Sequence, residues 1–287
     1  FGRTVTGMEI SPDGRNFREN TRFSRFTNVP ELLTMFRSFA DVKTKEDLDL
    51  PLPDLKGGKP EVVSVKPSET LTNYVDELVS RAERIRGGSV DPREDNMLKV
   101  TSEGRLAALD MRLIDDTLPA DPNGKVARAT DNIYDIWKAT SKDRLAQMVF
   151  CDLSVPSKQK VKGLKETESQ DQDGETAKPE ASPDDLLAAT SRGSFSVYDE
   201  IKKNLVDMGV PVDEIAFIHD FNGDKAKAQL FKDVRAGKVR VLLGSTAKMG
   251  EGTNVQERLV ALHHLDAPWK PSAVEQREGR ILRQGNK

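Results

Sequence analysis

Arginines near the end of the chain are the residues best suited to chemistry. Residues 276–283 read QREGRILR, and a helix that begins after Pro271 and Ser272 could contain them. On such a helix Gln276, Arg280 and Arg283 follow at intervals of four and three, so they would share one face. A guanidinium is permanently charged and binds two oxygen atoms at once. The pattern indicates a polyphosphate ligand, although a solvated basic helix end explains an isolated arginine triplet better.

A glycine loop upstream could approach the same ligand. The apolar run 239–243 predicts a buried strand, and residues 244–254, GSTAKMGEGTN, follow it. Three glycines beside hydroxyl groups let this backbone come close to a phosphate or a ribose. A second apolar run, 259–265, predicts another strand, and a turn over 266–271 leads to the arginines. A strand, a glycine loop, a second strand and the arginine helix follow one another in this order. A merely solvated helix end would not explain that order.

In this order the residues resemble motifs V and VI in the second motor lobe of superfamily 2 helicases. Residues 276–283 fit the Gln-Arg-x-Gly-Arg-x-x-Arg pattern of that group at every fixed position. The branch that this chain resembles most is that of the Swi/Snf-type DNA translocases. This similarity rests on the order Ser245-Thr246, residues 250–254, Asp266, Trp269, Pro271 and then Gln276. Similar segments occur fused to adenine-specific DNA methylases of phages and plasmids. The resemblance is strong over residues 215–287.

Before residue 215 the resemblance weakens, and it reaches back to about residue 97. One departure lies inside the strong part, where Asn254 is followed by Val255 and Gln256. The Swi/Snf-type branch more often has Asn-Leu-Thr at these positions, so the end of the motif V loop is matched less closely.

The resemblance implies a role for each site residue. It implies a lobe that closes on ATP and Mg²⁺ held by a first lobe, with duplex DNA as the partner. Arg280 and Arg283 match the arginine-finger positions. The positions near the ribose and the lobe interface are Gly250, Glu251, Gly252, Thr253, Asn254 and Gln276. The positions near the nucleic-acid backbone are Ser245, Thr246, Lys248 and Arg277.

Two motifs of a complete motor do not occur in these 287 residues. The sequence holds no Gly-x-x-x-x-Gly-Lys-Ser/Thr phosphate loop, and no Asp-Glu-x-His motif precedes residue 97. We therefore expect the chain to be the C-terminal part of a longer ATP-dependent helicase or translocase, inactive alone. The alternatives are a non-catalytic nucleic-acid or partner-binding module that kept the fold, and the helicase part of a methylase fusion.

The pattern of elements from residue 147 onward predicts an α/β fold. Apolar runs at 147–152, 215–218, 239–243 and 259–265 predict strands, and periodic segments between them predict helices. This alternation implies a parallel sheet with helices on both faces. The resemblance makes that sheet RecA-like. We assign residues 97–287 to the second motor lobe.

Residues 1–96 are expected to be the tail of a first lobe and the connection between lobes. Arginines interleaved with phenylalanines over residues 1–29 could hold nucleic acid, but a solvated loop is the favoured interpretation. Apolar periodicity predicts helices over 30–40 and 71–85. The alternation at 61–65 predicts a strand.

Composition limits the function classes. No apolar run is long enough to cross a membrane, and the single cysteine excludes an internal disulfide. Both features favour a cytoplasmic protein, of bacterial or phage and plasmid origin by the resemblance. The net charge of −3 means that any DNA contact comes from a local patch. Residues 157–182 are almost free of apolar side chains and are expected to form a flexible insertion.

Two other chemical interpretations are weaker. His263 and His264 are adjacent, and on a strand they would point to opposite faces, so they do not suit one metal ion. We predict no metal site. The run Asp266-Ala267-Pro268-Trp269 resembles the Asp-Pro-Pro-aromatic motif of adenine methyltransferases with one mismatch, but no glycine-rich loop for a methyl donor accompanies it.

Overall fold

The computed structural model describes residues 1–10, 17–41, 43, 47, 51–88, 90–91, 93–156, 194–249 and 254–286. The expected insertion at 157–182 lies outside these residues. The chain divides into two compact units. One comprises residues 1–51 and 78–100, and the other residues 52–77 and 101–287. The division into a first-lobe tail over 1–96 and a second lobe over 97–287 stays a prediction.

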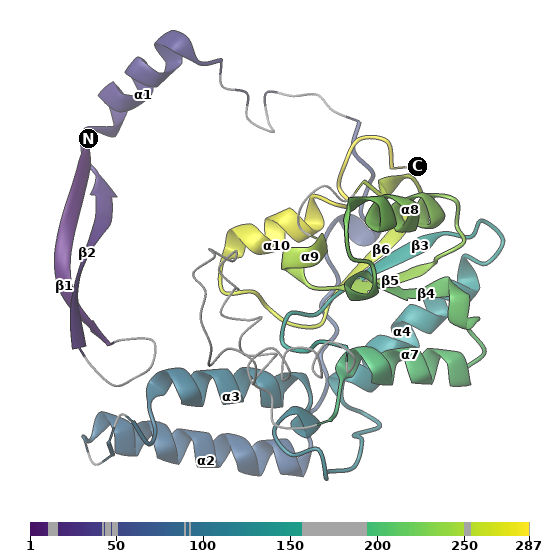
Figure 1. The fold of residues 1–287 in the computed structure, drawn as a ribbon, viewed down its shortest axis with the longest axis horizontal. Coiled ribbons are helices and arrows are strands. Elements are labelled where there is room, and N and C mark those ends of the chain that lie inside the picture. The colour runs from purple at the N-terminus through teal and green to yellow at the C-terminus, as the bar shows by residue number, and fades with distance from the viewer. Residues whose placement is uncertain are drawn as a thin grey trace, which may run out of the picture. The chain divides into compact units, whose positions relative to one another are not determined.

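The second unit contains a parallel sheet of four strands (Figure 1). The strands are β3 (Ala146–Phe150), β4 (Ile215–Phe217), β5 (Val241–Gly244) and β6 (Leu259–His264). Their spatial order is β4-β5-β3-β6, and every neighbouring pair is parallel. All four predicted strands are confirmed, because short apolar runs bounded by polar turns are what a sheet covered on both faces requires.

Helices cover both faces of this sheet. They include α3 (Met97–Leu109), α4 (Lys125–Ala139), α7 (Val197–Asp207), α8 (Asp224–Arg235) and the single turn α9 (Thr246–Met249). One apolar cluster joins α3, α4 and α7 to Val149 of β3, and the other joins α8 and α9 to Met148 and Phe150. Successive residues of a strand face opposite ways, so one strand contributes to both clusters. The predicted RecA-like α/β fold is confirmed.

Helix α10 (Pro271–Glu278) is shorter than the sequence predicts. Gly279 donates its backbone N–H to Glu275 at 2.8 Å and closes the last turn, and the N–H groups of Arg280 and Ile281 bond three residues back. Arg280 and Arg283 therefore lie in turns after the helix. The prediction that they share a helix face with Gln276 is wrong, because glycine at position 279 ends the regular helix.

In the first unit, β1 (Gly2–Ile10) and β2 (Phe17–Phe26) form an antiparallel hairpin, followed by α1 (Val29–Phe39). The favoured interpretation of this region as a loop is wrong, since alternating threonines and aromatic residues suit paired strands. The helix predicted over 30–40 is confirmed. Residues 61–65 belong to no strand. An alternating segment needs a neighbouring edge for its backbone groups, and the sequence could not supply that information.

The remaining helix of regular length, α2 (Glu69–Arg86), confirms the prediction over 71–85. The described residues also contain short 3-10 helices, at Lys56–Gly58, Met111–Leu113, Val212–Glu214, Ile218–Asp220 and Gln256–Arg258. Among the described residues, no helix combines the length and the apolar character needed to cross a membrane.

A buried cation holds the amino edge of the sheet. Arg240, 1% exposed, donates to the carbonyl oxygens of Trp137 at 2.6 Å and Leu145 at 3.1 Å. Its Nη1 lies 3.6 Å from a carboxylate oxygen of Glu214, which also accepts a 2.7 Å hydrogen bond from the Trp137 indole. These contacts fix the start of β5 to α4, so we assign this cluster to stability.

At the carboxyl ends of the strands, the connections diverge in the way that is typical of ligand-binding sites in open α/β sheets. Strands β3 and β5 are neighbours, but the chain leaves β3 toward α7 on one face and leaves β5 into α9 on the other. Open α/β sheets bind ligands where neighbouring connections diverge in this way. Gly244, at the end of β5, allows close packing there. A Cβ atom on it would lie 2.5 Å from Ile218 and 2.6 Å from Met249.

Candidate functional site

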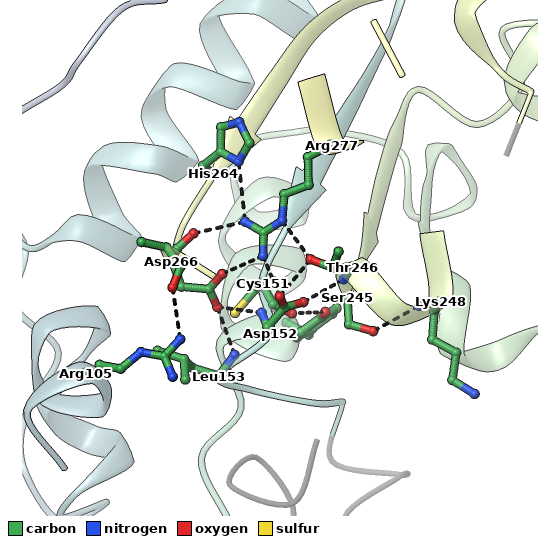
Figure 2. Close-up of polar contacts among 12 residues, drawn as sticks. Arg105, Cys151, Asp152, Leu153, Ser245, Thr246, Lys248, His264, Asp266 and Arg277 are labelled. Atoms are coloured by element: carbon green, nitrogen blue, oxygen red, sulfur yellow. Dashed lines mark hydrogen bonds and ion pairs between the residues drawn. The ribbon is translucent and has the colours of Figure 1, made fainter. Parts of the chain in front are cut away.

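Asp152 lies where β3 ends and links three segments (Figure 2). Its carboxylate accepts hydrogen bonds from the backbone N–H of Thr246 at 2.6 Å and from the Thr246 hydroxyl at 2.7 Å. It also accepts one from Nη2 of Arg277 at 2.5 Å. Thr246 begins α9 and Arg277 belongs to α10, so one carboxylate ties the end of β3 to both motif segments.

Arg277 is the centre of this network. Its side chain is fully buried, and every guanidinium nitrogen has a partner. Nε donates to the Thr246 hydroxyl at 2.7 Å, and Nη1 donates to the backbone oxygen of Asp266 at 2.9 Å. Nη1 also lies 3.3 Å from Nδ1 of His264, and Nη2 is shared between Asp152 and Asp266. The five N–H groups of an arginine are thus taken up inside the protein.

Asp266, at the end of β6, completes the network. Its Oδ2 accepts the backbone N–H groups of Asp152 at 2.5 Å and Leu153 at 2.8 Å. Burial raises the pKa of Asp266, and the Asp152 carboxylate raises it further, whereas Arg277 lowers it. Two carboxylates on one guanidinium form a buried cluster that binds the ends of β3, β5 and β6 into one piece. We assign it a positioning role.

The structure changes the set of residues predicted to contact nucleic acid. Arg277 is removed from that set, because its guanidinium is buried and fully bonded. Ser245 is buried, and its hydroxyl accepts the backbone N–H of Lys248. The Thr246 hydroxyl is engaged by Asp152 and Arg277. Lys248 alone of the four has an exposed side chain, so it remains the predicted contact with the best access.

Asn254 links two arginines on the neighbouring surface. Its side-chain oxygen accepts from Nη1 of Arg283 at 2.9 Å, and its backbone oxygen accepts from Nη1 of Arg235 at 2.5 Å. The structure thus brings Asn254 and Arg283 together. Arg280 is partly buried and Gln276 is exposed.

Gly250, Glu251, Gly252 and Thr253 lie outside the described residues. Met249, directly before these residues, is fully buried, and Asn254, directly after them, contacts Arg283.

Both histidines of β6 have structural partners. His263 is half-buried, and its Nε2 lies 2.9 Å from the side-chain oxygen of Gln147, whereas His264 lies beside Arg277. The two rings thus contact different residues. Within the described ranges, no group of three histidine, cysteine, aspartate or glutamate side chains could hold a metal ion.

Acid is expected to destabilise the second unit through these histidines. Burial lowers the pKa of His263 from 6.5 to about 4, and the neighbouring His264, itself at a pKa of about 4, adds to the effect. Between pH 6.5 and about pH 4 the unfolded chain binds more protons than the folded one. The unfolding free energy therefore falls as the pH falls through this range. For His263 the loss is about 2 kcal/mol between pH 7 and roughly pH 4.5.

Urea unfolding of the wild type and His263→Gln at both pH values measures this contribution. Comparing the two proteins cancels the other titrating groups. The variant should lose about 2 kcal/mol less stability on acidification. Equal losses in the two proteins would contradict the assignment.

Sequence reasoning missed several residues of this edge. Asp152 could have been found as an acidic residue directly after a predicted strand. Arg235 carries no signal beyond its place in the last turn of α8. Arg105 donates to the backbone oxygen of Ala267 at 2.9 Å and stacks 4.3 Å over the ring of Trp269. It thereby holds the turn that leads into α10, and only the tertiary structure connects these positions.

Comparison with known families agrees with this geometry. Residues 200–285 match the family model described as the helicase conserved C-terminal domain. The match begins in α7, covers β4, β5, β6 and α10, and ends after Arg283. It indicates a helicase-family C-terminal lobe. No curated protein matches the chain.

Proposed function

We propose that this chain carries the second motor lobe of an ATP-dependent nucleic-acid helicase or translocase. The single observation that supports it best is the junction at Asp152. There the two segments that resemble motifs V and VI, both inside the matched stretch 200–285, meet through the Asp152–Arg277 ion pair. A lobe that transmits closure from nucleotide to nucleic acid needs these segments to move as one piece.

The proposed arginine fingers are Arg280 and Arg283. Both follow α10 directly, and α10 is anchored by the buried Arg277. Arg283 is exposed beside Asn254, where a phosphate can reach its guanidinium. Guanidinium groups stabilise the charge that develops on a transferring phosphoryl group. The side chains of Asp152 and Asp266 are committed to Arg277, so we assign no Mg²⁺ ligand to the described residues.

The finer assignments rest on sequence motifs. Residues 276–283 support membership of superfamily 2. The order Ser245-Thr246, residues 250–254, Asp266, Trp269, Pro271 and Gln276 supports its Swi/Snf-type branch. Duplex DNA is the proposed nucleic acid, with Lys248 as a backbone contact. We further propose a first lobe that grips Mg²⁺ and ATP, and a link to phage or plasmid DNA methylases.

The chain alone is expected to bind duplex DNA and to hydrolyse no ATP. Phosphoryl transfer requires a phosphate loop and acidic metal ligands, and the 287 residues contain no phosphate-loop motif. The measurements are fluorescence anisotropy with a labelled duplex and phosphate release with and without DNA. ATP turnover clearly above that of an Arg280→Ala control would refute the proposal that hydrolysis needs a separate first lobe to hold Mg²⁺ and ATP. A chain that binds no duplex at low salt would refute the proposed function.

A further inference from the structure

The hairpin β1–β2 sorts its residues by chemistry onto two faces. In an antiparallel pair, directly opposed residues share a face, and the face alternates along the strand. One face carries Arg3 with Arg25, and Val5 and Gly7 follow on the same face of β1. The opposite face carries Gly2 with Phe26, Thr4 with Phe23 and Met8 with Glu19.

A β-bulge produces this separation. The register shifts between Arg3 and Thr4, because Ser24 is inserted between the partners of these two residues. In a regular strand, residues 23 and 26 would fall on opposite faces, and the extra residue returns both phenylalanines to one face. The rings of Phe23 and Phe26 confirm the arrangement on the other face, where their centroids are 4.8 Å apart.

The arginine face carries charge that the described residues do not neutralise. Arg3 and Arg25 lie directly opposite each other, and like charges in that position destabilise a strand pair. Both are exposed, and neither has an ion-pair partner among the described residues. This local excess of cations contrasts with the whole chain, whose net charge is −3.

We propose that the arginine face of the β1–β2 hairpin binds the phosphate backbone of a nucleic-acid duplex. This inference rests on the proposed function and adds a contact surface outside the sheet. Phosphates are the polyanion that arginine forks fit best. A two-stranded ribbon has the width to enter a major groove, and nine residues at about 3.4 Å each extend roughly 30 Å, close to one duplex turn.

The salt dependence of duplex binding tests this contact. Anisotropy titrations with a labelled duplex of about 20 base pairs would run from roughly 50 to 200 mM salt, because each neutralised phosphate adds about 0.9 to the logarithmic slope. In the full chain, Arg3→Gln/Arg25→Gln should reduce the slope by nearly two and weaken binding at least tenfold. Arg3→Lys/Arg25→Lys keeps both charges and should retain most of the slope.

A matched control removes equal charge elsewhere in the first unit. Arg84 and Arg86 are exposed in the last turn of α2, so Arg84→Gln/Arg86→Gln should keep the wild-type slope. A hairpin variant with the wild-type slope, or a control that loses as much, would overturn the inference while the proposed function stands. Wild-type chain that binds no duplex would instead overturn the proposed function. If the hairpin variant loses binding to polyglutamate but keeps its duplex affinity, the partner is an acidic protein and the inference is wrong.

Discussion

Arg280→Ala is expected to lower nucleic-acid-stimulated ATP turnover by roughly 10³–10⁵ when this lobe acts with the lobe that holds Mg²⁺ and ATP. The guanidinium would meet the phosphate only when the lobes close. It would then stabilise the transition state much more than the bound ground state. ATP affinity should therefore change far less than turnover. Arg280→Lys should not restore activity, since an ammonium group cannot bind two oxygens in the same plane.

Turnover, nucleotide binding and thermal unfolding would be measured for each variant. Arg128→Ala, which removes an exposed arginine from α4, is the matched control and should behave as wild type. Near-normal turnover in Arg280→Ala with an unchanged melting temperature would show that residues 279–283 are only a basic surface turn.

Arg277→Met is expected to cost about 3–5 kcal/mol of unfolding free energy, because it removes the only cation that contacts two buried carboxylates within the described residues. Asp152 and Asp266 would then lose the one guanidinium that contacts both carboxylates inside the protein. The backbone ends of β3, β5 and β6 would lose their common anchor. The loss should be fully present in the absence of nucleic acid, which separates positioning from ligand contact.

Urea unfolding measures this effect. Lys203→Met breaks the exposed pair between Lys203 and Asp207 and should cost well under 1 kcal/mol. A loss in Arg277→Met no larger than in this control would contradict the positioning role. Intact stability combined with weakened duplex binding would restore the original interpretation of Arg277 as a nucleic-acid contact.

The order of elements in the second unit could be read from the sequence alone. Strands buried on both faces need continuous apolar runs, and amphipathic helices need their own period, so local pattern sufficed for β3, β4, β5 and β6. The resemblance over residues 215–287 could also be read from the sequence, since the motif residues stand at fixed distances along the chain.

Local pattern failed where distant segments decide the outcome. The hairpin β1–β2 depends on pairing between strands and on one inserted residue, and neither leaves a strong local signal. Residues 61–65 alternate like a strand, but they find no partner edge. The end of α10 at Glu278 separates the arginines that a longer helix would have aligned.

Tertiary structure alone decided which arginine of residues 276–283 is buried. The sequence presents Arg277, Arg280 and Arg283 as chemically equal side chains. Only folding brings Asp152 and Asp266, from the ends of two strands, to the place where Arg277 points. Desolvating a guanidinium is unfavourable unless carboxylates and carbonyl oxygens surround it. The position of those partners, and not the motif itself, makes Arg277 the anchor and leaves Arg280 and Arg283 as the proposed phosphate ligands.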